Sequence, residues 1–75
     1  MRVEIKPLYP LNKRVEGGWR EFPEGSTPRE ILEALGFSPP EIREMRVAVD
    51  GALVDMDRPV NEGTTLVLMA TLAGG

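Results

Sequence analysis

The chain has 75 residues, which is enough for one small domain, because domains typically contain roughly 100 to 150 residues. Hydrophobic residues make up 41% of the chain and charged residues 28%, so the composition indicates neither a disordered chain nor a membrane protein. Nine Lys and Arg against twelve Asp and Glu give a net charge of −3, which disfavours a nucleic-acid partner.

The chain contains no Cys and no His. It therefore has no thiol nucleophile and no thiolate ligand for zinc or an iron–sulfur cluster. It also lacks the side chain that most often serves as a general base or a metal ligand near neutral pH. A domain of this size has little room for the cleft that two catalytic carboxylates need. The sequence therefore predicts a protein that is not itself an enzyme and that binds no metal.

Hydropathy predicts where the protein is found. The longest apolar run, residues 66–70, is far shorter than the roughly 20 residues that span a bilayer. The residues after Met1 do not follow the pattern of a secretion signal, in which a basic segment precedes an apolar one. We therefore expect a cytoplasmic protein with no membrane partner.

The first part of the chain is predicted to form a β-hairpin. Apolar and charged residues alternate over residues 1–6, which is the period of a half-buried strand, and we predict this strand over residues 2–8. Proline, asparagine and two adjacent glycines predict a loop over residues 9–18. Residues 19–22 then form the second extended segment.

A helix is predicted over residues 28–35. Thr27, Pro28 and Glu30 occupy the N-cap, N1 and N3 positions, which is the order found in a capping box. Apolar residues follow at helical spacing, and Gly36 supplies a stop signal at the C-terminal end. This helix is expected to be the main one of the domain.

A short capped turn and a second hairpin are predicted to follow the helix. Ser38 precedes two prolines and could cap a turn that runs to Arg43, although the sequence leaves the type of this turn open. Two strands, residues 46–50 and 52–54, are then joined by Asp50-Gly51. This dipeptide favours a type I′ turn, in which both central residues have positive φ.

The end of the chain is predicted to form a turn-rich segment over residues 55–63 and a last strand over residues 65–72. The long connection after the helix would let this strand lie in the centre of the sheet, parallel to the first. The predicted fold class is therefore α+β, a roll in which a mixed four- to five-stranded sheet packs on one main helix. We expect the domain to cover residues 1–72 and residues 73–75 to form a flexible tail.

The predicted last strand is apolar on both faces, whereas a sheet with one exposed face should alternate. If Leu66 and Leu68 face the helix, Val67 and Met69 face outward. The outward side chains then form either a patch that binds a partner or the second covered face of a central strand.

Gly74 and Gly75 end the sequence. Two residues without side chains would place an α-carboxylate at the tip of a thin segment that can enter a narrow active site of another protein. Chemistry at that carboxylate needs no side chain of the chain itself, which agrees with the missing Cys and His. A frayed end is the alternative interpretation.

Several segments resemble the ubiquitin-like sulfur carriers of the ThiS/MoaD family, which are the thiamin-biosynthesis sulfur carrier and the small subunit of molybdopterin synthase. The resemblance covers nearly the whole chain, and residues 65–68 ahead of Gly-Gly also look like the end of ubiquitin. It implies the β-grasp fold. The segments that carry it are Phe22-Pro23-Glu24-Gly25-Ser26-Thr27, Val47-Ala48-Val49-Asp50-Gly51, Pro59-Val60-Asn61-Glu62-Gly63 and Leu72-Ala73-Gly74-Gly75.

This resemblance implies a carrier whose Gly75 carboxylate is adenylated by an ATP-using partner related to ubiquitin-activating enzymes. Sulfur from a persulfide then displaces AMP and leaves a thiocarboxylate on Gly75. The same resemblance implies that Gly74, Leu72, Val67 and Met69 contact partners. The chain itself would bind no cofactor, because the activating partner uses the ATP. A large synthase subunit or a thiazole synthase is the implied second partner.

The sequence departs from both branches of this family. Ala70-Thr71 stands where molybdopterin-type carriers often have two prolines, and the loop over residues 9–18 is long for a thiamin-type carrier. The turn over residues 54–59 resembles the molybdopterin type, which the sequence therefore favours slightly. A carrier for tRNA thiolation or for a tungsten cofactor, a ubiquitin-like protein modifier and a plain β-grasp interaction module stay open.

Other residues are weaker candidates for a site. Asp55 and Asp57 could bind a cation, but the sequence places no third oxygen ligand nearby, so a solvated turn is the preferred interpretation. Trp19 and Tyr9 could form a binding surface, although a single Trp in so small a domain more often lies at the edge of the core. Glu30 is interpreted as a helix-cap residue rather than an acid.

Overall fold

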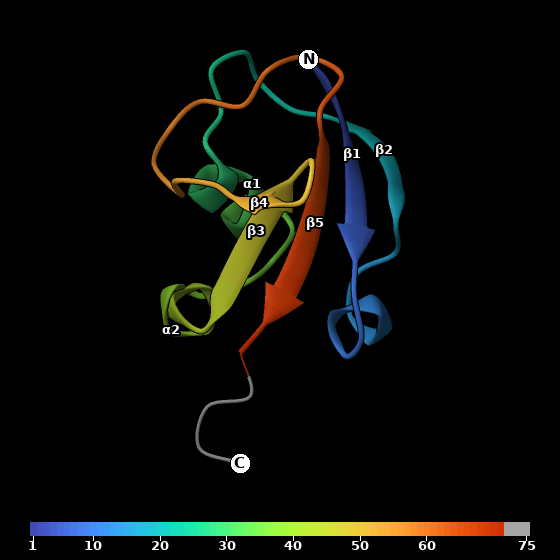
Figure 1. The fold of residues 1–75 in the computed structure, drawn as a ribbon, viewed down its shortest axis with the longest axis vertical. Coiled ribbons are helices and arrows are strands. Elements are labelled where there is room, and N and C mark those ends of the chain that lie inside the picture. The colour runs from blue at the N-terminus through green and yellow to red at the C-terminus, as the bar shows by residue number, and fades with distance from the viewer. Residues whose placement is uncertain (72–75) are drawn as a thin grey trace.

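Five strands form one mixed sheet in the computed structural model, which describes residues 1–71. The strands lie in the order β2-β1-β5-β3-β4, so β5 occupies the centre (Figure 1). Two α-helices and one short 3-10 helix complete the described part of the chain. In chain order the elements are β1 (Arg2–Pro7), η1 (Leu11–Lys13), β2 (Gly18–Glu21), α1 (Pro28–Ala34), α2 (Pro39–Arg43), β3 (Met45–Val49), β4 (Ala52–Leu53) and β5 (Thr65–Ala70).

The central strand β5 pairs with β1 in parallel and with β3 in the antiparallel direction. Antiparallel pairs add β2 beside β1 and β4 beside β3. This arrangement confirms both predicted hairpins and the predicted parallel pair between the first and last strands. Leu72, where the last strand is predicted to end, and the predicted tail over residues 73–75 lie outside the described residues.

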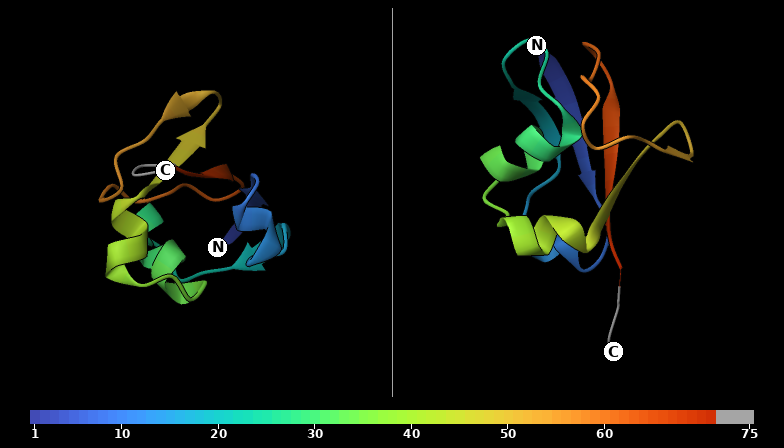
Figure 2. Two further views of the ribbon diagram at one scale, coloured as in Figure 1. Left: turned by 90° about the horizontal axis from the view of Figure 1, so that it is seen from below. Right: turned by 90° about the vertical axis from the view of Figure 1, so that its left-hand side faces the viewer.

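The hydrophobic core lies between the sheet and α1, and α2 lies on the same side of the sheet (Figure 2). Alternate side chains of β1, β3 and β5 point to this side, as the period of a strand requires. Leu66 and Leu68 are both 0% exposed, which confirms that they face the helix. The other side chains that are at most 1% exposed include Val3, Ile5, Ile31, Leu32 and Val47.

Local sequence signals fix both ends of α1. The Oγ1 of Thr27 accepts a hydrogen bond from the Glu30 N–H at 3.1 Å, and Oε1 of Glu30 accepts one from the Thr27 N–H at 2.9 Å. The predicted capping box is therefore confirmed. At the other end the Gly36 N–H reaches the Glu33 carbonyl at 3.0 Å, and the Phe37 N–H reaches the Leu32 carbonyl at 3.1 Å. These two bonds form a Schellman motif, for which Gly36 adopts a φ of +100°.

The turn after Ser38 is an α-helix, α2, with a capping box of its own between Ser38 and Glu41. The next predicted turn is also confirmed, because Asp50 and Gly51 have φ values of +51° and +81°. Positive φ at both positions is what a type I′ turn requires. The hairpin that it closes pairs Val49 with Ala52.

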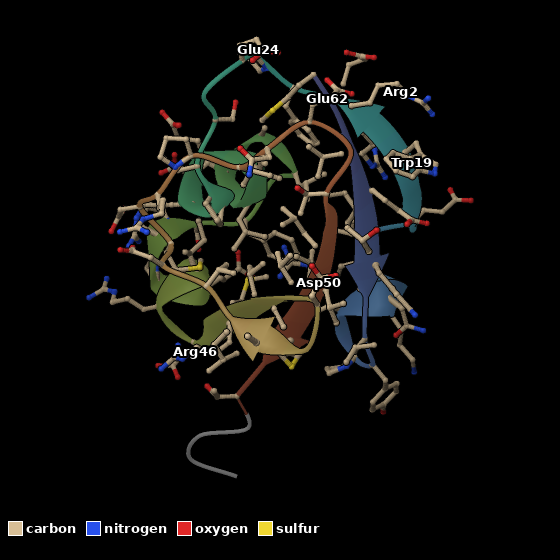
Figure 3. The ribbon with its side chains drawn as sticks, turned by 45° about the horizontal axis from the view of Figure 1, so that its top comes forward. Arg2, Trp19, Glu24, Arg46, Asp50 and Glu62 are labelled. Carbon is tan, nitrogen blue, oxygen red and sulfur yellow. The ribbon has the colours of Figure 1, made fainter. Side chains whose placement is uncertain are left out.

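Tertiary packing overrides the sequence pattern at two places near the N-terminus. The segment predicted as a loop contains η1, because Leu11 and Val15 are buried in the core. Trp19 lies outside the core with 48% of its surface exposed. Its position opposite Glu4 directs it to the face away from α1, where the Arg2 guanidinium lies 5.0 Å from the centre of its ring (Figure 3). No helix within residues 1–71 is both long and apolar enough to cross a membrane.

Candidate functional site

The face of the sheet opposite α1, here called the outer face, carries the predicted partner-binding residues of β5. Leu66 and Leu68 are buried in the core, whereas the alternating Val67 and Met69 are half-buried on the outer face. Both α-helices of the described chain lie on the opposite side (Figure 2). The outer face of β5 is therefore covered by neither helix.

Strand pairing places apolar residues of β3 and β4 beside Val67. Val67 lies beside Ala48 of β3, which in turn pairs with Leu53 of β4. Leu53 is 64% exposed. We call these four residues, Ala48, Leu53, Val67 and Met69, the apolar patch.

Two basic residues border the apolar patch. Lys6 of β1 pairs with Val67, and Arg46 of β3 pairs with Met69, and both basic side chains are exposed. Arg46 lies at the end of the sheet where β5 ends (Figure 3). Its Nη1 donates to the carbonyl oxygens of Arg43 at 3.2 Å and Met45 at 2.8 Å, which holds the guanidinium in place. The patch is thus apolar with a positive border, although the whole chain is acidic.

Sequence reasoning identified Val67 and Met69 but not the other members of this surface. Leu53 could have been found, because a two-residue type I′ turn fixes the register and so pairs residue 48 with residue 53. Lys6 and Arg46 could not, because their positions depend on which strands lie beside β5.

The predicted C-terminal site begins beside this surface. β5 ends at Ala70, which pairs with Met45, and the Thr71 N–H donates to the Glu44 carbonyl at 2.7 Å. Three further predicted site residues, Leu72, Gly74 and Gly75, lie outside the described residues. The described chain therefore shows the apolar patch and the point from which the C-terminal residues start.

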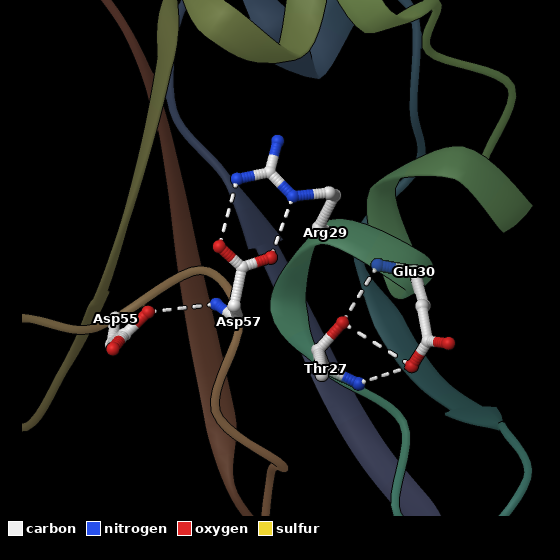
Figure 4. Close-up of polar contacts among 5 residues, drawn as sticks. All are labelled: Thr27, Arg29, Glu30, Asp55 and Asp57. Atoms are coloured by element: carbon white, nitrogen blue, oxygen red, sulfur yellow. Dashed lines mark hydrogen bonds and ion pairs between the residues drawn. The ribbon is translucent and has the colours of Figure 1, made fainter.

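The carboxylates of Asp55 and Asp57 belong to a structural turn. Nε of Arg29 donates to Oδ1 of Asp57 at 2.8 Å, and Nη2 donates to Oδ2 at 3.2 Å (Figure 4). This pairing lowers the pKa of Asp57. Asp55 Oδ1 accepts a hydrogen bond from the Asp57 N–H at 2.9 Å. These contacts join the turn that contains Asp55 and Asp57 to the start of α1, beside the Thr27–Glu30 capping box. They give both carboxylates a structural role, and neither is assigned to a cation.

Solved structures with similar folds come from archaea and bacteria. The putative molybdopterin converting factor subunit 1 of Pyrococcus furiosus has a TM-score of 0.75 and 17% identity, with 96% of this chain and 99% of that chain covered. SAMP1 of Haloferax volcanii has a TM-score of 0.74 and 19% identity, with both chains covered completely. A complex of subunits 1 and 2 of the molybdopterin-converting factor of Helicobacter pylori 26695 contains a chain with a TM-score of 0.66 and 19% identity, again with complete coverage. These likenesses show the β-grasp fold.

Sequence comparison also relates the chain to a much longer protein. A stretch of 48 residues is 44% identical to part of the threonine–tRNA ligase of Phenylobacterium zucineum (strain HLK1). The stretch covers 64% of this chain but only 7% of that ligase.

The family model of the ThiS family matches residues 12–75, which is most of the chain. The resemblance identified from the sequence is therefore confirmed. With this match and the sheet order of the β-grasp fold, the chain belongs to the ThiS family.

Proposed function

We propose that the chain is a sulfur carrier whose Gly75 carboxylate is adenylated by a ubiquitin-activating-like enzyme and converted to a thiocarboxylate. The observation that carries the proposal is the match to the ThiS family, which extends through Gly74 and Gly75. The absence of Cys and His supports it, because an activated α-carboxylate needs neither. Gly75 is the terminal residue of the carrier in this proposal.

The proposed reaction places all acid–base and redox groups on partners. The Gly75 carboxylate attacks the α-phosphorus of ATP, which releases pyrophosphate and forms an acyl adenylate. A persulfide sulfur then attacks the acyl carbon, and AMP leaves with the electron pair of the broken C–O bond. A second thiol cleaves the resulting S–S bond, which leaves the thiocarboxylate on Gly75 and a disulfide on the partners. The carrier contributes position, since it brings the acyl group to each active site.

The apolar patch is the proposed docking surface for these partners. Its half-buried Val67 and Met69 and its exposed Leu53 offer apolar area that a partner could remove from water. The Helicobacter pylori structure is a complex of subunits 1 and 2 of a molybdopterin-converting factor. That complex supports a large synthase subunit as one partner, beside the adenylating enzyme.

The proposed destination of the sulfur is molybdopterin, ahead of thiamin thiazole. The turn over residues 54–59 and the fold of the Pyrococcus furiosus protein support this order. In this proposal the chain is a co-substrate or a small synthase subunit rather than an enzyme. It acts in the cytoplasm and holds no cofactor of its own.

An intact-mass measurement tests the proposal. The protein is incubated with the adenylyltransferase of its own genome, ATP and a persulfide sulfur donor, and ATP is omitted in the control. The mass should rise by about 16 Da, the difference between sulfur and oxygen in the acyl group. Fragmentation should place the change at Gly75. No rise in mass contradicts the carrier function, and a rise at another residue contradicts the site.

A protein modifier is the second candidate. Its support is the fold shared with the Haloferax volcanii protein, which is a small archaeal modifier protein. A modifier would leave Gly75 joined to lysine side chains through isopeptide bonds. Peptides whose lysine carries a branch that ends in Gly75, found in digests of the host proteome, would favour this candidate; in a tryptic digest that branch would be long, because no Lys or Arg follows Arg58.

A β-grasp interaction module is the third candidate. The sequence likeness to a short part of a threonine–tRNA ligase supports it, because there a similar stretch occurs within a much longer protein. A module of this kind would bind its partner unchanged when Gly74 and Gly75 are deleted, whereas a carrier would lose activation.

A further inference from the structure

Thr71, the residue that follows β5, is bonded to the end of α2 through its backbone and through its side chain. Its N–H donates to the Glu44 carbonyl oxygen at 2.7 Å. Its hydroxyl lies 2.8 Å from that same oxygen and 3.2 Å from Oε2 of Glu44. The single hydroxyl proton therefore has two acceptors on one residue. We call these contacts the Thr71 clamp.

Glu44 is a fixed point of the fold. It is the C-cap residue of α2, where its N–H donates to the carbonyls of Glu41 and Ile42. Ile42 and Met45, on either side of it in the sequence, are each 2% exposed and belong to the core. The acceptor of the clamp is thus held by buried residues, although the clamp itself lies on the surface.

The clamp stands between the two parts of the proposed site. Met69, the last residue of the apolar patch, lies two positions before Thr71, and the residues that lead to Gly75 begin directly after it. A partner docked on the patch therefore meets a chain whose path is fixed as far as Thr71. Each residue that must be ordered during entry into an active site costs conformational entropy, and a fixed starting point removes part of that cost.

We propose that Thr71 is a positioning residue for activation, because its clamp to Glu44 sets the point and direction from which the C-terminal residues leave the domain. This inference rests on the proposed function, since it concerns delivery of the Gly75 carboxylate. The hydroxyl is the part that can be tested alone, because a substitution can remove it and leave the backbone bond. Loss of one such hydrogen bond should slow adenylation by about 2- to 10-fold.

The test compares Thr71→Val, which keeps the branched shape without the hydroxyl, with Thr71→Ser, which keeps the hydroxyl. Adenylation is followed as ATP–pyrophosphate exchange with the adenylyltransferase of the same genome. We expect Thr71→Val to lower kcat by about 2- to 10-fold with an unchanged Kd for the enzyme, and Thr71→Ser to stay within about 2-fold of wild type. Urea melts should show that both variants stay folded, with Thr71→Val losing no more stability than one surface hydrogen bond supplies.

Hydrogen exchange at the amide of residue 71, measured on the free protein, separates positioning from direct contact with the enzyme. Exchange should be faster in Thr71→Val and unchanged in Thr71→Ser. Slower adenylation without faster exchange would overturn the inference, because the hydroxyl would then act on the enzyme itself. Equal rates for Thr71→Val and wild type would also overturn it. No exchange of pyrophosphate with the wild-type protein would instead refute the proposed function, and the inference with it.

Discussion

The guanidinium of Arg14 pairs with the carboxylate of Glu41 and so joins the segment after η1 to α2. The same guanidinium lies 4.6 Å from the centre of the Phe37 ring, just ahead of that helix. Glu41 is also the N3 residue of the α2 capping box, where its Oε1 accepts the Ser38 N–H at 2.9 Å. One carboxylate therefore stabilises both the start of α2 and its contact with a distant segment.

Stability should depend on the charge of Glu41 in a defined range of acid pH. The bonds from Arg14 and then from Ser38 lower the pKa of Glu41 from 4.5 to about 2. A carboxylate whose pKa is lower in the folded state stabilises the fold fully above its unfolded pKa, and the contribution disappears as pH falls through the folded pKa. The difference in unfolding free energy between wild type and Glu41→Gln should therefore shrink between about pH 4.5 and about pH 2.

Urea melts over this pH range measure that difference. The same comparison in an Arg14→Gln background is the control, and there the pH dependence should be weaker, because the largest cause of the lowered pKa is gone. A difference that stays constant from neutral pH down to about pH 2 would contradict the assigned role of the pair.

The cap of α1 should contribute to stability and not to activation. Thr27→Ala removes the oxygen that accepts the Glu30 N–H and should cost about 0.5 to 2 kcal/mol of unfolding free energy. Thr27→Ser keeps an accepting oxygen and should stay close to wild type. Pyrophosphate exchange should be unchanged in both, because the cap lies outside the apolar patch. Equal urea midpoints for Thr27→Ala and Thr27→Ser would show that the hydrogen bond stabilises nothing.

Gly36 should be required because of its backbone conformation and not because a side chain at this position would clash with neighbouring atoms. Its φ is +100°, and a Cβ built at this position meets no atom within 4 Å. Gly36→Ala should therefore cost about 1 to 2 kcal/mol through left-handed strain alone. Gly36→Asn should cost less, because Asn adopts this conformation more readily. Thermal or urea unfolding of the two variants measures the order, and an Ala variant as stable as wild type would be incompatible with the Schellman motif.

Local signals made much of the fold predictable. The Thr27 capping box and the Asp50-Gly51 turn depend on neighbouring residues alone, so the sequence predicted both correctly. The burial of Leu11 in a predicted loop depends instead on packing against the sheet. Trp19 is exposed because of the register between β2 and β1, which composition does not reveal.

The candidate site, like the fold, was predictable from the sequence only in part. Successive side chains of a strand point to opposite faces, and this rule predicted that Val67 and Met69 lie on the other side of β5 from Leu66 and Leu68. The basic border and the Thr71 clamp were not predictable, because Lys6 and Glu44 approach β5 only through tertiary structure. The roles of Gly74 and Gly75 stay predictions from the sequence and the family.

The two faces of β5 should respond differently to substitution. Leu68 is 0% exposed, so Leu68→Ala leaves a cavity in the core and should cost about 2 to 5 kcal/mol. Met69 is half-buried on the outer face and lies opposite Arg46. In Met69→Asp the new carboxylate would lie on the outer face rather than in the core, so the loss of stability should be much smaller.

Binding to the adenylyltransferase should be affected more by Met69→Asp than by Leu68→Ala, which is the opposite of the order expected for stability. A carboxylate on the apolar patch must lose its water when a partner covers it, so Met69→Asp should weaken binding to the adenylyltransferase and lower pyrophosphate exchange. Met69→Leu is the matched control and should bind as wild type does, since it keeps an apolar side chain of similar size. Urea melts and titration calorimetry on the same preparations separate the two effects. If Met69→Asp unfolds the domain, the outer face of β5 is part of a second core. If it stays folded and is activated like wild type, the partner docks elsewhere, because an unpaired charge inside a closed apolar interface could not leave affinity unchanged.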